Sequence, residues 1–276
     1  MRVIALVFCV LASVFPLTGT LQSKEFVDLE LVLAVDISRS MDLDEQALQR
    51  SGYVAAFRDP ALMKAIRNGP NGRIAVTYVE WAGLNSQIVR VPWQVIATRE
   101  DALKFADALY QQPFSSAFFT SISGALELSR QLFSTSPVRG LRRVIDVSGD
   151  GPNNSGAPVE LARDRVVDSG VVINGLAIEL SDRVGPYTFF DLPDLDLYYQ
   201  DCVIGGPGAF VLTIRSKQEF VPSIRKKLLL EIAGTPFAPA PRVWRAQAGR
   251  SKGKYDCLIG EKMWEQFRRN RPPALE

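Results

Sequence analysis

Histidine is absent from this sequence of 276 residues. Its absence excludes the Ser-His-Asp and Cys-His catalytic arrangements and histidine-ligated zinc sites, and it removes the commonest general base. A large excess of charge of one sign is also missing, because the formal net charge is only +2. So small an excess gives no indication of nucleic-acid binding. Most familiar hydrolase mechanisms are therefore excluded, and no nucleic-acid partner is expected.

Long apolar runs are scarce, and one of them lies at the N-terminus. Arg2 precedes an apolar run over residues 3–17, and the small polar residues 18–20 follow it. This pattern is typical of a secretory signal peptide, which we assign to residues 1–20, and it predicts a periplasmic or secreted protein. A membrane-spanning helix needs roughly 20 apolar residues, so we expect no permanent membrane span after removal of the signal. An uncleaved anchor is the alternative, because no Ala-x-Ala cleavage site is visible.

Cysteine is equally rare, with three residues in the whole chain. Cys9 falls in the expected signal peptide, which leaves Cys202 and Cys257. An even number of cysteines in an exported chain predicts a disulfide between these two residues. Two independent buried thiols are the alternative, because the sequence cannot show that the two residues approach each other.

The remaining chain has the composition of an ordinary globular protein, with 47% hydrophobic and 22% charged residues. Apolar, β-branched segments alternate with segments of helical periodicity. Asp42 and Glu45 have the spacing of a capping box and predict a helix up to Phe57. Strands are expected at 29–35, 73–81, 87–96, 141–148, 170–180 and 210–214, and further helices at 99–111, 121–133, 158–169 and 217–233. This order predicts a Rossmann-like, doubly wound α/β fold: a mainly parallel sheet with one antiparallel edge strand and helices on both faces.

The periodicity stops at Thr235, where prolines at positions 236, 239 and 241 interrupt the chain. The segment 235–276 contains nine basic and four acidic residues. Because the overall charge is close to zero, the preceding part of the chain must be acidic. We therefore expect a basic C-terminal extension, 235–276, docked on the domain and held there by the Cys202–Cys257 disulfide.

Oxygen-bearing side chains gather where strands are expected to end. Asp36, Ser38 and Ser40 follow the first apolar strand, and Asp150 follows another; Thr120 precedes a helix. In open α/β sheets, ligands bind outside the carboxyl ends of the strands. Taken singly, these residues would be ordinary turn or helix-cap residues. Taken together, they predict one divalent-cation site.

These residues resemble the metal-ion-dependent adhesion site, or MIDAS, of von Willebrand factor A (vWA) domains. That motif consists of Asp-x-Ser-x-Ser, a loop threonine and an aspartate at a strand end. The resemblance covers roughly residues 28–234, so we expect a vWA-like domain over 21–234. Within the family, the chain is similar to exported bacterial vWA-like proteins of unassigned function.

The resemblance implies a role for each residue of the motif. Ser38 and Ser40 would bind the metal directly, and Asp36, Thr120 and Asp150 directly or through water. An all-oxygen site of two carboxylates and neutral hydroxyls independently suits Mg²⁺, with Mn²⁺ as a possible substitute. An open coordination position would accept an Asp or Glu from another protein, which is how the family generally binds its partners.

One feature departs from the family pattern. Many vWA domains have Gly-Gly before the loop threonine, whereas Phe118 and Phe119 precede Thr120 here. The departure puts loop flexibility, and any switching of affinity, in doubt. It also supplies large apolar side chains, so we assign Arg39, Phe118 and Phe119 to a partner-binding rim.

The leading hypothesis is a non-enzymatic, metal-dependent protein-binding module. One alternative is a Mg²⁺-dependent phosphatase-like enzyme, since an aspartate after a buried strand also begins aspartyl-phosphate phosphatases. Those enzymes resemble Asp-x-Asp-x-Thr, and Ser38 occupies the place of their second aspartate. A second alternative is a metal-free structural or assembly protein. Asp146, inside an expected strand, is interpreted as a structural hydrogen-bond acceptor rather than a ligand, because an unpaired buried carboxylate is costly.

Overall fold

Six strands form one sheet in the order β3-β2-β1-β4-β5-β6. A computed structural model describes residues 24–180, 191–234 and 255–270, and the expected signal peptide lies outside these residues. The strands are β1 (Glu25–Asp36), β2 (Ile74–Trp81), β3 (Gln87–Ile96), β4 (Val138–Gly149), β5 (Val172–Ile178) and β6 (Val211–Ile214). All neighbouring strands are parallel except β2 and β3. The predicted fold class is therefore confirmed, with β3 as the antiparallel edge strand.

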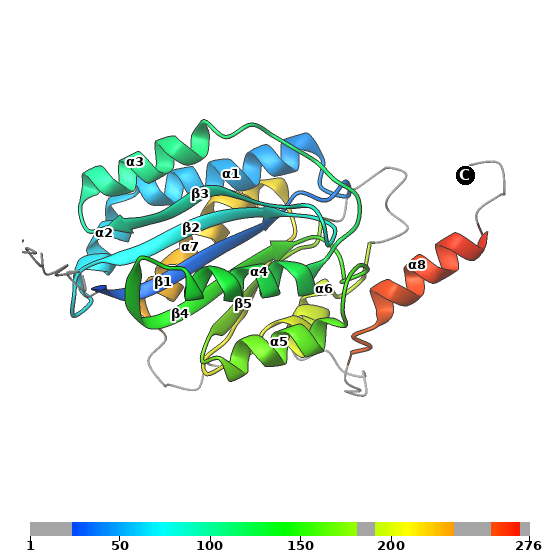
Figure 1. Ribbon diagram of the computed structural model, residues 1–276. Coiled ribbons are helices and arrows are strands. Elements are labelled where there is room, and N and C mark those ends of the chain that lie inside the picture. Colours follow the sequence, from blue (N-terminus) through cyan, green and yellow to red (C-terminus); the bar gives the residue numbers. More distant parts are fainter. Residues whose placement is uncertain (1–23, 181–190, 235–254, 271–276) are drawn as a thin grey trace, which may run out of the picture.

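Helices cover both faces of the sheet (Figure 1). The helices are α1 (Leu43–Arg58), α2 (Pro60–Arg67), α3 (Arg99–Tyr110), α4 (Ile122–Ser134), α5 (Val159–Asp168), α6 (Leu195–Tyr198), α7 (Phe220–Ala233) and α8 (Ile259–Asn270), with a π-helical turn, η2 (Tyr199–Val203), and a 3₁₀ turn, η3 (Lys217–Glu219). The predicted capping box is present at α1: Asp42 Oδ1 accepts from the amide of Glu45, whose carboxylate accepts from the amide of Asp42. The sequence did not predict α2 as a separate helix. Helix α2 begins at Pro60, directly after Asp59, whose side chain caps the N-terminus of the helix.

The alternation of side chains along β1 divides the core into two layers. Leu29, Leu31 and Leu33 are fully buried beneath α1, α2, α3 and α7. Val32 and Ala34 face the opposite layer, which α4, α5 and α6 cover. Parallel strands buried on both faces are nearly all apolar, as residues 31–35 of β1 are. Among the described residues, none of the helices combines the length and the hydrophobicity that crossing a bilayer requires.

Charged side chains interrupt the apolar core layer beneath α1, α2, α3 and α7. Lys227 of α7 lies fully buried between two carboxylates, Asp146 of β4 and Glu231 of α7, with 2.6 Å from its Nζ to Asp146 Oδ1. Burial, and then the negative charge of Asp146, raise the pKa of the Glu231 carboxyl to about 7. Asp146 thus has a cationic partner inside the core, in keeping with its interpretation as a structural residue.

Candidate metal centre

Three loops meet at the carboxyl end of the sheet. β1 and β4 are parallel neighbours, so Asp36 at the end of β1 and Asp150 just after β4 emerge at the same edge. The third loop, which carries residues 117–120, is joined to the loop after β1 by a short parallel bridge between Ser38 and Ala117. In this bridge the Arg39 amide donates to the Ala117 carbonyl at 3.0 Å. This bridge brings residues 118–120 alongside Ser38.

Hydroxyls connect the two carboxylates of the candidate site. The amide of Ser38 donates to Asp36 Oδ1 at 2.6 Å, and the Oγ atoms of Ser38 and Ser40 lie 2.9 Å apart. The Ser40 hydroxyl donates to Asp150 Oδ1 at 2.8 Å. Within the described chain, no group of three or more His, Cys, Asp or Glu side chains forms a metal-binding cluster. The candidate site instead combines the two carboxylates of Asp36 and Asp150 with the neutral hydroxyls of Ser38 and Ser40.

Asp36 has the environment of a metal ligand. Its side chain is fully buried, and its Oδ2 atom has no hydrogen-bond partner among the described residues. Burial, followed by the nearby Asp150 carboxylate, raises the pKa of Asp36 well above its usual value. A Cβ at position 149 would lie 2.8 Å from both Asp36 Oδ2 and the Tyr199 hydroxyl, so only glycine leaves room for the carboxylate there. A cation beside Asp36 would satisfy the unpaired oxygen and offset the repulsion from Asp150.

Thr120 is positioned by a residue that sequence reasoning missed. Two hydrogen bonds join the backbone of Thr120 to Asn154. The Thr120 amide donates to Asn154 Oδ1, and the Asn154 amide donates to the Thr120 carbonyl, both at 2.8 Å. Asn153, fully buried, accepts from the amide of Ser123 through its Oδ1 atom. The two asparagines thus fix the threonine loop to the loop that carries Asp150. In the sequence, the only signal was the adjacent pair of asparagines three residues after that aspartate.

Phe119 adopts a backbone conformation that glycine would adopt more easily. Its φ is +71°, in the left-handed region, where a side chain costs roughly 1–2 kcal/mol. The chain therefore keeps the conformation that suits the Gly-Gly of many vWA domains, and tolerates the strain. The Phe118 and Phe119 side chains are 52% and 42% exposed, and the Arg39 guanidinium lies 3.5 Å from the centre of the Phe118 ring. All three residues of the expected rim are thus at the site.

A pocket of about 60 Å³ opens between the rim and the hydroxyls. It is lined by Ser38, Arg39, Ser40, Phe118, Phe119, Thr120, Asn154 and Trp264. Trp264 belongs to α8 and was not among the residues expected at the site. The signal that could have found it is the grouping of apolar residues at helical spacing, Ile259, Met263, Trp264 and Phe267, in an otherwise polar segment.

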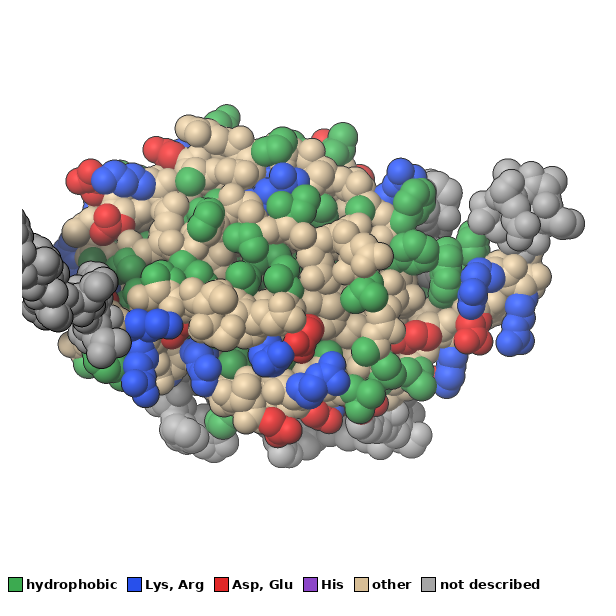
Figure 2. Space-filling model, in the orientation of Figure 1, with side chains coloured by type: hydrophobic (Ala, Val, Ile, Leu, Met, Phe, Trp, Pro, Cys, Tyr) green, Lys and Arg blue, Asp and Glu red, His purple; other side chains and the backbone are tan. Residues whose placement is uncertain are grey.

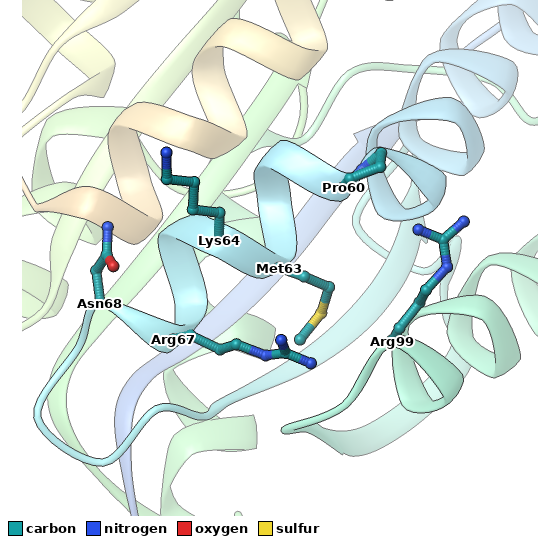
Figure 3. Close-up of a pocket in the computed structure, with 6 residues that line it drawn as sticks. All are labelled: Pro60, Met63, Lys64, Arg67, Asn68 and Arg99. Carbon is teal, nitrogen blue, oxygen red and sulfur yellow. The ribbon is translucent and has the colours of Figure 1, made fainter.

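A second, larger hollow of about 390 Å³ lies between α2 and the start of α3 (Figure 3). Arg67 extends toward the side on which Arg99 lies, the Arg99 side chain turns upward and away from Arg67, and Lys64 points to the other side of α2. Its lining, completed by Pro60 and Asn68, contains neither a carboxylate nor a hydroxyl. The hollow is therefore unsuited to a divalent cation, although it is the larger of the two.

The disulfide expected between Cys202 and Cys257 is present and joins η2 to the turn before α8. Two hydrogen bonds support the same connection. The Tyr255 amide donates to Asp201 Oδ2 at 2.8 Å, and the Tyr255 hydroxyl donates to the carbonyl of Pro193 at 2.9 Å. Residues 255–260 are thereby fixed to the face of the domain that α5 and α6 cover.

Many solved structures are similar to this chain, and three of them illustrate the likeness. Proximal thread matrix protein 1 from the mussel byssus has a TM-score of 0.54 at 16% identity, over 76% of this chain and 49% of that one. A structure of the same mussel protein with a zinc-occupied MIDAS motif has a TM-score of 0.50 at 17% identity, over the same shares of the two chains. The pilus adhesin SpaC from Lactobacillus rhamnosus GG has a TM-score of 0.55 at 12% identity, over 76% of this chain and 31% of that one. This chain thus spans half or less of these proteins, and at such identities the likeness concerns the fold.

Sequence comparison identifies the family of the chain. No curated protein sequence matches the chain. The family model described as "Protein of unknown function (DUF1194)" matches residues 26–236, which include all five expected metal ligands and exclude α8. The resemblance to a vWA domain is confirmed by the fold and by these relatives. The chain therefore belongs to the DUF1194 family, which is described as a family of unknown function.

Proposed function

We propose that the protein is a non-enzymatic binding module that uses a Mg²⁺-type divalent cation to grip an acidic residue of a partner protein. The observation that carries the proposal is the buried, unpaired Oδ2 of Asp36, which lies near Asp150 among serine hydroxyls. An unpaired buried polar atom costs about 1–3 kcal/mol, so a native chain is expected to satisfy it. A bound cation is the partner that best suits two carboxylates and neutral oxygens.

Each residue of the site has a distinct role in this proposal. Ser38, Ser40 and Thr120 would offer hydroxyl oxygens, and Asp36 and Asp150 would offer carboxylates. The cation supplies an electrophilic centre for an incoming carboxylate. Because few of these oxygens are charged, the site would leave much of the positive charge for the partner's Asp or Glu. Mg²⁺ fits this hard oxygen set, and Mn²⁺ would substitute.

The comparisons support a metal-dependent interaction module. The mussel byssus protein has a MIDAS motif that holds zinc in one structure, and SpaC is a pilus adhesin. The disulfide supports an oxidising compartment, so we place the mature protein in the periplasm or outside the cell. The phosphatase alternative is disfavoured because it needs a general acid two residues after Asp36. That position is Ser38, whose hydroxyl lies 2.9 Å from Ser40 Oγ.

The decisive experiment combines metal titration with capture of partners. Calorimetry should show one Mg²⁺ or Mn²⁺ bound by the wild type and none by Asp36→Ala, while Asp44→Ala, which removes an exposed carboxylate of α1, binds as the wild type does. Circular dichroism should show both variants folded. Equal metal affinity in the wild type and in Asp36→Ala would sink the proposed site.

Capture from the native cell envelope then tests the function itself. The partner should be lost in EDTA, return with Mg²⁺ and survive moderate salt, because surface ion pairs contribute only about 0–1 kcal/mol and are screened. Phe119→Ala should weaken capture while leaving metal affinity unchanged. A partner that stays bound in EDTA, or that is lost through salt screening alone, would favour the metal-free assembly alternative.

A further inference from the structure

Helix α8 lies outside the residues that the family model matches, yet it reaches the candidate metal centre. The ring of Trp264 meets the ring of Phe119 edge-on, with 4.9 Å between their centres. Phe267, one turn further along α8, stacks on Trp264 at 5.5 Å. Three aromatic rings from two distant parts of the sequence thus form one continuous wall beside the pocket.

The start of α8 is fixed to the loop that carries Asp150. A Cβ at Gly260 would lie 2.1 Å from the carbonyl oxygen of Asn153, so only glycine permits this approach of helix to loop. Asn153 also donates through Nδ2 to Glu261 Oε1 at 2.7 Å. The disulfide at Cys257 holds the preceding turn. The aromatic wall is therefore positioned by the same loop that completes the metal site.

The rest of α8 extends away from the sheet at the end where the parallel strands finish (Figure 1). Trp264 and Phe267 are half-buried, Trp264 against Phe119 and Phe267 against Trp264, whereas Arg268 and Arg269 are exposed. Figure 2 shows hydrophobic side chains gathered at the junction of the body and α8, with basic side chains on both sides of them. An apolar wall with a basic border beside a cation site complements a ligand that is both acidic and apolar.

The size of the pocket indicates what kind of ligand this is. Pockets for small organic molecules usually measure about 300–1,000 Å³, whereas this one measures about 60 Å³. Such a space accepts a carboxylate but not an aromatic ring, so any bulky group attached to the carboxylate has to lie on the rim. Trp264 and Phe267 are half-buried rather than fully exposed, and the pocket beside Trp264 has room for one side-chain carboxylate, which favours a protein segment over a membrane surface as the occupant.

We propose that α8 is one wall of the binding face, and that the site takes a protein segment in which Asp or Glu adjoins a large apolar residue. The carboxylate enters the pocket, and the apolar side chain lies against Phe119 and Trp264. This inference rests on the proposed metal-dependent function and adds the identity of the segment. It assigns Trp264 to ligand binding, outside the residues of the MIDAS motif, with Phe267 stacked on it.

Three synthetic peptides of the form Gly-Ser-x-y-Ser-Gly, with Phe-Asp, Ser-Asp or Phe-Asn at the centre, serve as probes for the Mn²⁺-loaded protein. The wild type should bind the Phe-Asp peptide about threefold to tenfold more tightly than the Ser-Asp peptide, as expected for one aromatic contact. The Phe-Asn peptide should not bind. Trp264→Ala should remove the preference for phenylalanine without changing Mn²⁺ affinity, measured by electron paramagnetic resonance. Gln266→Ala, on the exposed side of α8, is the matched control and should retain the preference.

The outcomes separate the two proposals. Binding that needs Asp and Mn²⁺ but shows no preference for phenylalanine, or a preference that persists in Trp264→Ala, leaves the metal function intact and overturns the role of α8. Absence of any Asp-dependent, metal-dependent binding overturns both. Trp264-dependent sedimentation with phosphatidylglycerol vesicles in EDTA, without a peptide preference, would identify a membrane surface as the occupant and overturn the proposal.

Discussion

Replacing Asp36 by asparagine should have opposite effects on stability without and with the metal. In the metal-free protein, the buried Asp36 Oδ2 has no hydrogen-bond partner among the described residues and lies near the Asp150 carboxylate. Asparagine keeps an oxygen to accept from the Ser38 amide, removes the negative charge, and replaces the unpaired Oδ2 by an N–H₂ group that can donate toward the Asp150 carboxylate. Because a buried unpaired polar atom costs about 1–3 kcal/mol, Asp36→Asn should stabilise the metal-free protein by a similar amount.

Metal should reverse this order. A ligand that binds only the folded state stabilises it by about 2.7 kcal/mol at a concentration of about 100 times Kd. The wild type should gain this amount from Mg²⁺, whereas the variant, with one carboxylate fewer, should gain much less. The variant is thus the more stable protein in EDTA and the less stable protein in Mg²⁺.

Thermal unfolding followed by circular dichroism measures both differences. Each kcal/mol should move the midpoint by about 2–4 °C for a domain of this size. Asp44→Asn, at an exposed carboxylate of α1, should follow the wild type under both conditions. If Asp36→Asn is instead less stable than the wild type in EDTA, and Mg²⁺ stabilises the two equally, the Asp36 carboxylate is a structural group and the reasoning fails.

Three further predictions concern the rest of the chain. Mass spectrometry should show that Cys202 and Cys257 both resist alkylation in the absence of reductant, and full labelling of the native protein would contradict this. Because the disulfide closes a loop of 55 residues, Cys257→Ser should lower the free energy of unfolding, measured in urea, by up to about 4 kcal/mol. The raised pKa of Glu231 means that the folded state binds the proton of this carboxyl more tightly than the unfolded state does, so the free energy of unfolding should fall as the pH rises from 4.5 to about 7. Urea titrations at several pH values should show a smaller fall for Glu231→Gln. An equally steep fall in the wild type and the variant would refute this. Phe119→Gly should be more stable than Phe119→Ala by about 1 kcal/mol in thermal unfolding, because glycine accepts a positive φ; the reverse order would show that position 119 is unstrained.

Local chemistry explains why much of the fold could be predicted from the sequence. The capping pair Asp42 and Glu45 lies three residues apart, so both partners are visible in one turn of sequence. Pro92, which cannot donate to a sheet ladder, correctly indicated an edge strand. The order of Asp36 and Asp150 after apolar strands placed both carboxylates at one edge, because parallel strands end there together.

Contacts between segments that are distant in the sequence could not be predicted from local chemistry. Nothing in the sequence near Asp146 shows that Lys227, 81 residues later, lies 2.6 Å away in the core. Asn154 fixes Thr120 through a side-chain oxygen, and an asparagine in a loop carries no sign of its partner. Trp264 belonged to a segment that was recognised as basic but weakly periodic. Its place at the pocket follows from tertiary packing around Gly260.

The disulfide also sets an order in which the binding face can be completed. A chain is synthesised from its N-terminus, so every oxygen ligand of the candidate site precedes Cys202, and the sheet through β6 can form before Cys257 is made. The aromatic wall of α8 is attached last, and covalently only where thiols are oxidised. A chain still in a reducing compartment would thus have its metal loops but lack a secured wall. With the proposed export and binding function, full binding strength would then be acquired only after oxidation, and the newly made protein would be kept from capturing acidic segments before that step.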